Sequence, residues 1–263
     1  MLADLLACAQ RLSVCSSAPA ACAEGHDLGE TGAATPESPD AAGTASTSPA
    51  LNSIQSNLAT IRATLRDMSY ADLCLPCTIE SLLSDSSKSS AIQFFEVLDH
   101  PAISVCLIAF PPGSCIPLHD HPGMHVFTKV MAGQLSISML DVDHPMPRSA
   151  IPSGTSVCAR NLRTSNFNCG ECCELSPVTG NIHGVTCIGD RTALMLDVNL
   201  PPYADAACHY FAPIQPSGEL CVIDEALAWS SCAASSALSQ AGSDKASKSK
   251  VEFRAGRKNQ KRR

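Results

Sequence analysis

The chain has 263 residues, with 18 Lys and Arg against 25 Asp and Glu, a net charge of −7 and only 4% aromatic residues. This length allows one or two domains. An acidic body with few aromatic side chains to stack on bases argues against nucleic-acid binding by the folded part. No apolar stretch is long enough to cross a membrane, so we expect no membrane partner.

The first fifty residues are predicted to be a disordered, low-complexity arm (1–50). The part from Ser16 to Pro49 is dominated by Ala, Ser, Thr, Pro, Gly and Glu, with a single leucine and no aromatic residue. Such a composition buries too little apolar surface to offset the entropy lost on ordering.

The last twenty residues form the second predicted tail, 244–263. They hold nine of the 18 Lys and Arg residues, opposed only by Asp244 and Glu252, so the tail carries +7 and the body −14. A solvated, disordered basic tail is the simplest interpretation, with a nuclear address or a polyanion contact as the alternative. We therefore expect a cytoplasmic protein, with the nucleus as a second location.

One ordered domain is expected over residues 51–243. It begins with an amphipathic helix, because Ile54, Leu58, Ile61 and Leu65 recur at three- and four-residue spacing. Short β-prone runs separated by Gly and Pro follow, with no helical periodicity between them, which favours an antiparallel sandwich or barrel. The expected strands are 92–98, 103–110, 126–131, 134–141, 182–187 and 193–198.

Two histidines in the segment Pro111–Met124 predict a metal site. His119 and His121 are two residues apart, so on a strand their imidazoles point to the same side. Neutral imidazoles suit a first-row transition metal. The best third ligand is His183, because small residues beside it permit close backbone approach and a barrel can bring distant strands together. The prediction is three histidines and no carboxylate.

Fifteen cysteines in a chain without a convincing secretory signal indicate a reducing compartment and free thiols rather than a disulfide framework. The run Cys169–Cys173 contains a CxxC step, but no matching second pair lies at zinc-binding distance in the sequence. We expect loop cysteines there, with structural zinc as the alternative.

Several segments, in the same order, resemble thiol dioxygenases of the cysteamine dioxygenase and plant cysteine oxidase family over residues 58–211. The densest is similar to the family's proline-rich strand that enters a His-x-His-Pro-Gly-Met turn, and another is similar to its third-ligand motif. The matching segments are Pro111–Met124, Val126–Leu140, Gly180–His183, Leu196–Val198 and Pro201–Tyr203. The interval 141–177 matches poorly, which leaves the shape of the substrate pocket open.

The resemblance implies an all-β core, a cupin-type double-stranded β-barrel (jelly roll), with Fe(II) bound by His119, His121 and His183. It also implies the reaction, in which O2 adds both oxygen atoms to a thiol and gives a sulfinic acid. The thiol would belong to cysteamine or to the N-terminal cysteine of a protein, whose oxidation marks it for degradation through the N-degron pathway and senses oxygen. The family also favours a monomer.

Further site residues follow from the same resemblance. Asp197 ends a strongly apolar stretch, where a carboxylate is costly unless it is hydrogen-bonded or functional, and it would orient a ligand ring or the substrate amine. Tyr203, in the Pro-Pro-Tyr position, would bond substrate or oxygen. The alternatives are a capping carboxylate and a packing tyrosine.

The pair Cys208 and Tyr210 is a candidate for a cysteine–tyrosine cross-link, suggested for related dioxygenases, because residues two apart share a face. Two ordinary side chains remain the default, and His209 should point away. His125 is expected near the ligands or on the surface rather than on the metal. The competing hypothesis for the whole chain is a non-catalytic, metal-binding cupin regulatory module.

Overall fold

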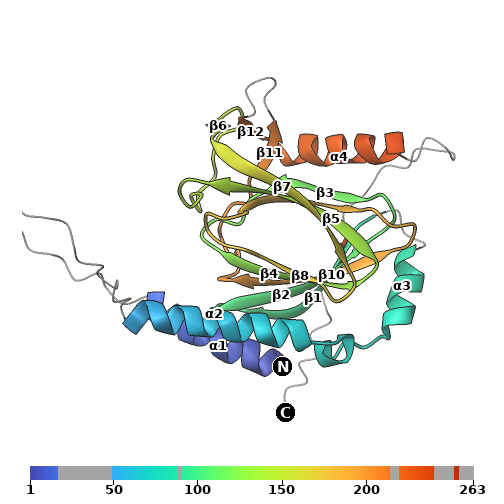
Figure 1. Cartoon of the computed structure of the whole chain (residues 1–263). Helices are drawn as coiled ribbons and strands as arrows, with labels where there is room; N and C mark the ends of the chain where they lie inside the picture. Colours follow the sequence, from blue (N-terminus) through green and yellow to red (C-terminus); the bar gives the residue numbers. More distant parts are fainter. Residues whose placement is uncertain (17–48, 88–90, 214–218, 240–251, 255–263) are drawn as a thin grey trace, which may run out of the picture.

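The computed structural model describes residues 1–16, 49–87, 91–213, 219–239 and 252–254, which form two facing β-sheets with helices on their outer sides (Figure 1). The helices are α1 (Leu2–Ser16), α2 (Pro49–Asp67), α3 (Ile79–Ser87) and α4 (Glu225–Ser239), with a short 3-10 turn at Tyr70–Leu73.

The first sheet has six strands in the order β13-β1-β2-β10-β4-β8. Its neighbours are antiparallel except β1 and β13, which are parallel. The strands are β1 (Gln93–His100), β2 (Ile103–Phe110), β4 (His125–Ala132), β8 (Cys172–Leu175), β10 (Ala193–Leu200) and β13 (Glu252–Arg254).

The second sheet has seven antiparallel strands in the order β6-β12-β11-β3-β9-β5-β7. They are β3 (Cys115–His119), β5 (Gln134–Val142), β6 (Ser156–Val157), β7 (Ala159–Asn168), β9 (Ile182–Cys187), β11 (Tyr210–Pro213) and β12 (Leu220–Ile223).

Alternation along β10 separates two cores. Leu194, Leu196 and Val198 belong to the cluster shared with the α1–α2 layer, whereas Met195 belongs to the cluster between the two sheets. Every residue of β10 is buried, and its first half, Ala193–Leu196, is a continuous apolar run, as expected of a strand that is covered on both faces. The sheets therefore enclose a packed interior, and the predicted all-β, cupin-type barrel is confirmed.

The six expected strands are present as β1, β2, β4, β5, β9 and β10, with ends shifted by at most two residues. Elements that were not predicted from the sequence include α3, α4, β6, β7, β8, β11 and β12. Nearly every residue of β7 is exposed, so it lacks the inside–outside alternation that would have identified it.

The predicted disordered arm over 1–50 is wrong for its first residues, because α1 packs beside α2 under the six-stranded sheet (Figure 1). Leu5, Cys8 and Ala9 are buried against Leu58 and Ile61 of the same cluster. Composition does not reveal this helix, because a short helix gains stability mainly from tertiary packing of one face. Residues 17–48 lie outside the described part.

The predicted disordered tail over 244–263 is wrong for Glu252–Arg254, which form β13 on the edge of β1. An exposed strand edge offers unpaired backbone groups, so a short extended segment can pair there whatever its composition. The rest of the tail lies outside the described residues.

The prediction of free thiols is wrong for one pair. Cys115 of β3 is disulfide-bonded to Cys232 of α4, with their Cα atoms 5.9 Å apart, a usual spacing for a disulfide. Helix α4 lies across the outer side of the seven-stranded sheet and brings residue 232 over β3, a proximity that linear spacing does not reveal (Figure 1). The other cysteines with described side chains are free.

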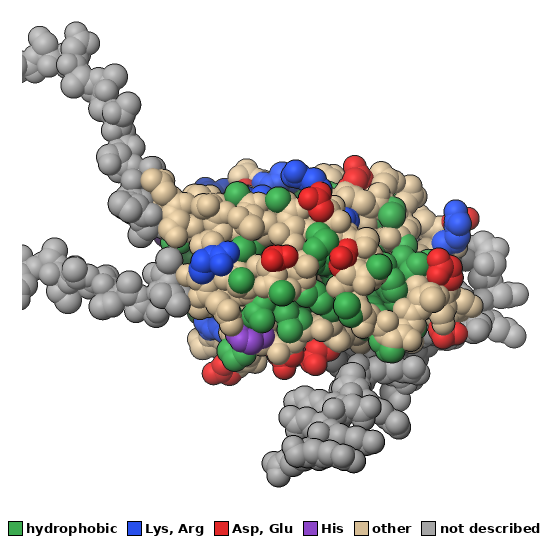
Figure 2. All heavy atoms as spheres, turned by 90° about the horizontal axis from the view of Figure 1, so that it is seen from below, with side chains coloured by type: hydrophobic (Ala, Val, Ile, Leu, Met, Phe, Trp, Pro, Cys, Tyr) green, Lys and Arg blue, Asp and Glu red, His purple; other side chains and the backbone are tan. Residues whose placement is uncertain are grey.

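The basic side chains on the drawn surface are few and dispersed, as the low basic content of the body predicts. On the face shown in Figure 2, Lys and Arg side chains are scattered among acidic and apolar ones rather than gathered in one patch. None of the described helices has the length and apolar character needed to span a membrane.

Candidate metal centre

Three histidines meet on neighbouring strands of the seven-stranded sheet. His119 ends β3, His121 follows it by two residues, and His183 lies on β9, where it is the direct antiparallel partner of His119. All three are at most 9% exposed. The sheet register thus brings together residues that are more than sixty positions apart in sequence.

The ring nitrogens converge on one point. Nε2 of His183 lies 3.2 Å from Nε2 of His121 and 3.1 Å from Nε2 of His119. Nitrogen ligands that each lie about 2.1 Å from one metal ion are about 3 Å from each other. Each Nε2 can either donate a hydrogen or accept one, so hydrogen bonds alone do not explain why three of them converge. A cation bound to all three lone pairs explains this spacing.

The second ring nitrogen of His119 supports this assignment, whereas those of the other two histidines do not bear on it. Nδ1 of His119 lies 2.9 Å from the carbonyl oxygen of Pro117 and would donate its hydrogen there, which leaves Nε2 as a lone-pair donor. Nδ1 of His121 and of His183 are buried and have no hydrogen-bond partner in the described part of the chain.

Burial keeps the three rings in the form that binds metals. It lowers the pKa of His119 to about 4, and it lowers the pKa values of His121 and His183 well below 6.5, with a smaller effect from the neighbouring rings. All three imidazoles are therefore neutral near pH 7. Within the described residues, this is the one group of His, Cys, Asp and Glu side chains that could hold a metal ion.

Asn181 holds the ligand loop from behind, and the sequence analysis missed it as a site residue. Its fully buried amide donates to the carbonyl oxygens of His121 (2.8 Å) and Ser176 (3.0 Å) and accepts from the His121 N–H (3.4 Å). The segment Gly180–His183 already stood out in the sequence, but only its histidine was predicted to be a site residue. Gly180 turns the chain at φ +64°, where a glycine is favoured.

Asp197 lies on the interior side of β10, in the same alternation as Met195. The Thr128 hydroxyl donates to Oδ1 of Asp197 at 2.6 Å, and burial, the larger effect, raises the pKa of Asp197 to about 6. In the described part of the chain this carboxylate accepts from a threonine hydroxyl and from no backbone amide, which argues against the alternative of a capping carboxylate.

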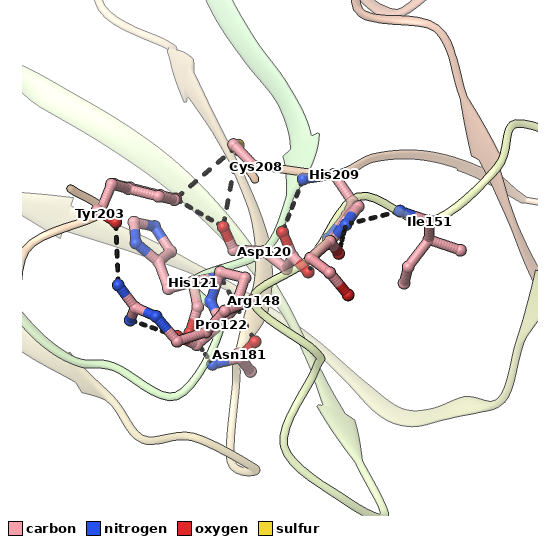
Figure 3. Close-up of polar contacts among 10 residues, drawn as sticks. Asp120, His121, Pro122, Arg148, Ile151, Asn181, Tyr203, Cys208 and His209 are labelled. Carbon is pink, nitrogen blue, oxygen red and sulfur yellow. Dashed lines mark hydrogen bonds and ion pairs between the residues drawn. The ribbon is translucent and has the colours of Figure 1, made fainter. Parts of the chain in front are cut away.

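Tyr203 packs against the ligand turn. Its ring centroid lies 5.2 Å from that of His121, and its hydroxyl donates to the backbone oxygen of Asp120 at 2.5 Å (Figure 3). Burial raises the pKa of Tyr203 well above 10, so it stays a phenol. Arg148 holds this loop from outside by donating to the carbonyl oxygen of Tyr203 at 2.9 Å.

Tyr210 lies beside His119, and Cys208 lies beside Tyr203 and the backbone of the ligand turn. The Tyr210 ring is 6.2 Å from the His119 ring, and Cys208 Sγ is 3.8 Å from the Tyr203 hydroxyl. Burial, the largest effect, raises the pKa of Cys208 to about 12. His209 points away from them, as expected, toward Asp120. The structure shows two separate side chains, so a cross-link stays a prediction.

Two other groups do not join the site. His125 begins β4 and is absent from the metal-binding group, as expected, and its buried Nδ1 has no partner among the described residues. The run Cys169–Cys173 lies on the β7–β8 turn and strand β8, apart from any group that could hold a metal in the described structure.

Comparison with known proteins places these features in one family. Residues 54–244 match the family model described as PCO_ADO. The chain is 28% identical to a probable 2-aminoethanethiol dioxygenase of Dictyostelium discoideum, over 55% of this chain and 65% of that protein. It is 28% identical to 2-aminoethanethiol dioxygenase of Mus musculus (48% and 56%) and 30% identical to plant cysteine oxidase 2 of Arabidopsis thaliana (60% and 57%). The chain thus spans less than two thirds of these relatives.

Solved structures with some likeness include oxalate decarboxylase from Bacillus subtilis, at 21% identity and a TM-score of 0.31 over 41% of this chain and 23% of that one. An oxalate oxidase with bound glycolate has 19% identity and a TM-score of 0.33, over 46% and 54%. The family match covers most of the chain and includes the three histidines, Asp197, Tyr203 and Cys208. The chain therefore belongs to the PCO_ADO family.

Proposed function

We propose that this protein is an iron-dependent thiol dioxygenase that oxidises cysteamine or the N-terminal cysteine of a protein. The observation that carries the proposal is the convergence of three buried, neutral imidazoles, His119, His121 and His183, without a carboxylate in the group. Family membership and relatives named as 2-aminoethanethiol dioxygenase and cysteine oxidase support it.

The three histidines would bind Fe(II) through Nε2. Bound Fe(II) would supply the redox chemistry that allows O2 to react with a thiol, R–SH + O2 → R–SO2H, in which sulfur is oxidised and both oxygen atoms are retained. Three neutral ligands leave the full positive charge of the ion in the site, which favours binding of the substrate as a thiolate.

We assign Asp197 the role of binding the substrate amine. Thr128 occupies Oδ1 of this carboxylate, so Oδ2 is the atom for an incoming ammonium group. A charge-assisted hydrogen bond in a buried site is both strong and directional. Both proposed substrates, cysteamine and an N-terminal cysteine, carry an amine two carbons from the sulfur, so this role requires the Asp197 carboxylate to lie within reach of a thiol bound at the three histidines.

We assign Tyr203 the role of lining the substrate position next to His121. Its hydrogen is donated to the Asp120 backbone, so its oxygen can act toward substrate only as an acceptor. A substrate N–H group could therefore bind there, whereas an oxygen atom carrying only lone pairs could not.

We further propose that Cys208 and Tyr210 can become linked by a thioether, since both side chains lie beside the ligand turn. The link removes one hydrogen from the Cys208 thiol and one from the Tyr210 ring, with O2 as the oxidant that accepts both, so the intact mass would fall by two hydrogen masses after aerobic turnover. An unchanged mass, or an unchanged mass of the tryptic peptide that contains Cys208 and Tyr210, would contradict it.

With a protein N-terminus as substrate, a rate that follows O2 concentration would make the enzyme an oxygen sensor in the N-degron pathway.

Oxygen uptake tests the proposal. The Fe(II)-loaded protein is given cysteamine, free cysteine or a peptide with an N-terminal cysteine, and O2 consumption is followed with an electrode. Thiol-dependent uptake that is lost in His183→Ala and kept in His144→Ala, a change at an exposed loop histidine, supports it. Metal binding without uptake on any thiol would favour the non-catalytic cupin.

A further inference from the structure

Asp120 is buried where a carboxylate would not be expected. It stands between the ligands His119 and His121, so strand alternation turns its side chain away from the metal-binding side. A carboxylate on the outer side of a small barrel normally meets water, yet Asp120 is 0% exposed. The residue that covers it is His209, which is 4% exposed.

Three hydrogen bonds join these two residues. The His209 backbone N–H donates to Oδ1 of Asp120 at 2.7 Å, and its Nδ1 lies 2.7 Å from Oδ2 (Figure 3). In return, the Asp120 backbone N–H donates to the carbonyl oxygen of His209 at 3.1 Å. The Nδ1–H to carboxylate bond can form whether the imidazole is neutral or protonated.

The pair also fixes which residues face the ligands. Tyr210 is the antiparallel partner of His119, so the tripeptides 119–121 and 208–210 run side by side in opposite directions. With His209 pointing outward to Asp120, Cys208 and Tyr210 lie on the other side. A slip of one residue would exchange these orientations.

The far side of the His209 ring is fixed as well. Its Nε2 accepts from the Ile151 N–H at 3.2 Å when the ring is neutral, or donates to the Ser149 carbonyl oxygen at 3.1 Å when the ring is protonated. The ring is therefore held at both ends, between the ligand turn and a separate loop. On the ligand side, the backbone oxygen of Asp120 also accepts from Tyr203.

We propose that Asp120 and His209 are positioning residues that lock the ligand turn against the 208–210 segment, and so set the directions of the His119 and His121 rings. Burying a carboxylate is costly, and here the cost is offset by bonds that all end on one partner. Removing either partner would leave the other buried and unpaired and let the ligand turn relax. The inference rests on the proposed metal site.

Cobalt binding tests this positioning role without any need for turnover. We compare the parent with Asp120→Ala, His209→Ala and a matched control, His144→Ala, by competition titration and by the visible absorption of bound Co(II), which reports ligand geometry. Groups that orient metal ligands change affinity by about 10- to 100-fold. The two alanine variants should bind Co(II) at least tenfold more weakly with altered bands, and the control should match the parent.

Conservative variants separate positioning from general stability. Asn at 209 keeps a nitrogen donor close to the Nδ1 position, and Asn at 120 keeps an acceptor for the His209 N–H, so His209→Asn and Asp120→Asn should recover most of the affinity and the parent spectrum. Alanine variants that melt at lower temperature but bind Co(II) like the parent would overturn the proposal, because the pair would then be only structural.

One measurement needs no variant that could fail to fold. In the parent, the His209 Nδ1–H should give a slowly exchanging, low-field imidazole proton resonance that is missing in His209→Asn. Absence of this resonance from the parent would overturn the proposal. Failure of the parent to oxidise any thiol would refute the proposed function and leave these readouts unaffected.

Discussion

Thr128 and Asp197 form a buried pair across the β4–β10 ladder, where the threonine hydroxyl donates to Oδ1 at 2.6 Å. Both side chains are at most 6% exposed. A single hydroxyl donor only partly replaces the hydration of a carboxylate, and burial accordingly raises the pKa of Asp197 to about 6. The barrel thus keeps an acidic group in its interior, the one to which we assign the substrate amine.

The shifted pKa of Asp197 predicts how stability depends on pH. Between pH 3.8 and about pH 6, Asp197 keeps its proton in the folded protein but has released it in the unfolded chain. Its contribution to stability therefore falls as the pH rises through this window. Asp197→Asn should therefore unfold at a higher urea concentration than the parent at pH 7.5, with both proteins metal-free. The free energy of unfolding should rise by up to about 3 kcal/mol.

The same comparison at pH 4 provides the control, because there the folded parent also carries a neutral side chain and the advantage of Asp197→Asn should largely disappear. The variant should also lose thiol oxidation by at least tenfold, since it cannot pair with an ammonium group. A variant less stable than the parent at pH 7.5 would show that the carboxylate is a stabilising charge instead.

The neutral histidines predict that protons compete weakly for the metal site. Burial lowers the pKa of His119 to about 4 and those of His121 and His183 well below 6.5. Three imidazoles of ordinary pKa would lose about 10³-fold in affinity between pH 7.5 and 5.5. We expect a loss below about threefold for Co(II), measured by competition titration. A thousandfold loss would mean that the rings are open to water.

The α1 helix should contribute to stability although its sequence resembles a flexible arm. Leu5 is 0% exposed in the α1–α2 cluster, so Leu5→Ala should lower the free energy of unfolding by about 2–5 kcal/mol. Leu162 on β7 is 65% exposed, and Leu162→Ala is the matched control with a change within about 0.5 kcal/mol. Urea denaturation measures both. Equal values would mean that α1 does not dock in solution.

The Cys115–Cys232 bond should hold α4 against the barrel. Trp229, the one tryptophan in the chain, lies on α4 with its ring 6.4 Å from that of Tyr210. Cys232→Ser, or a reductant, should move its fluorescence to longer wavelength and make it easier to quench with acrylamide. Cys221→Ser, at a free cysteine of β12, is the control. Unchanged emission would show that packing alone keeps the helix in place.

Local sequence patterns predicted the barrel strands and the paired ligands, because strand periodicity and the spacing of His119 and His121 are short-range properties. The small residues beside His183 and then the resemblance indicated it as the third ligand, and the register of β3 and β9 places it opposite His119. Composition over fifty residues hid α1, whose apolar face covers only a few positions. Asp120 and His209 are 89 residues apart, and such a pairing exists only after the chain has folded.

The most direct test of the central claim is the origin of the oxygen in the product. The Fe(II)-loaded protein is incubated under ¹⁸O2 with cysteamine and with a peptide that begins with cysteine, and the products are weighed by mass spectrometry. A thiol dioxygenase predicts a sulfinic acid carrying two ¹⁸O atoms on at least one of them, absent in His183→Ala. Unmodified thiol, or a disulfide without ¹⁸O, would contradict the account.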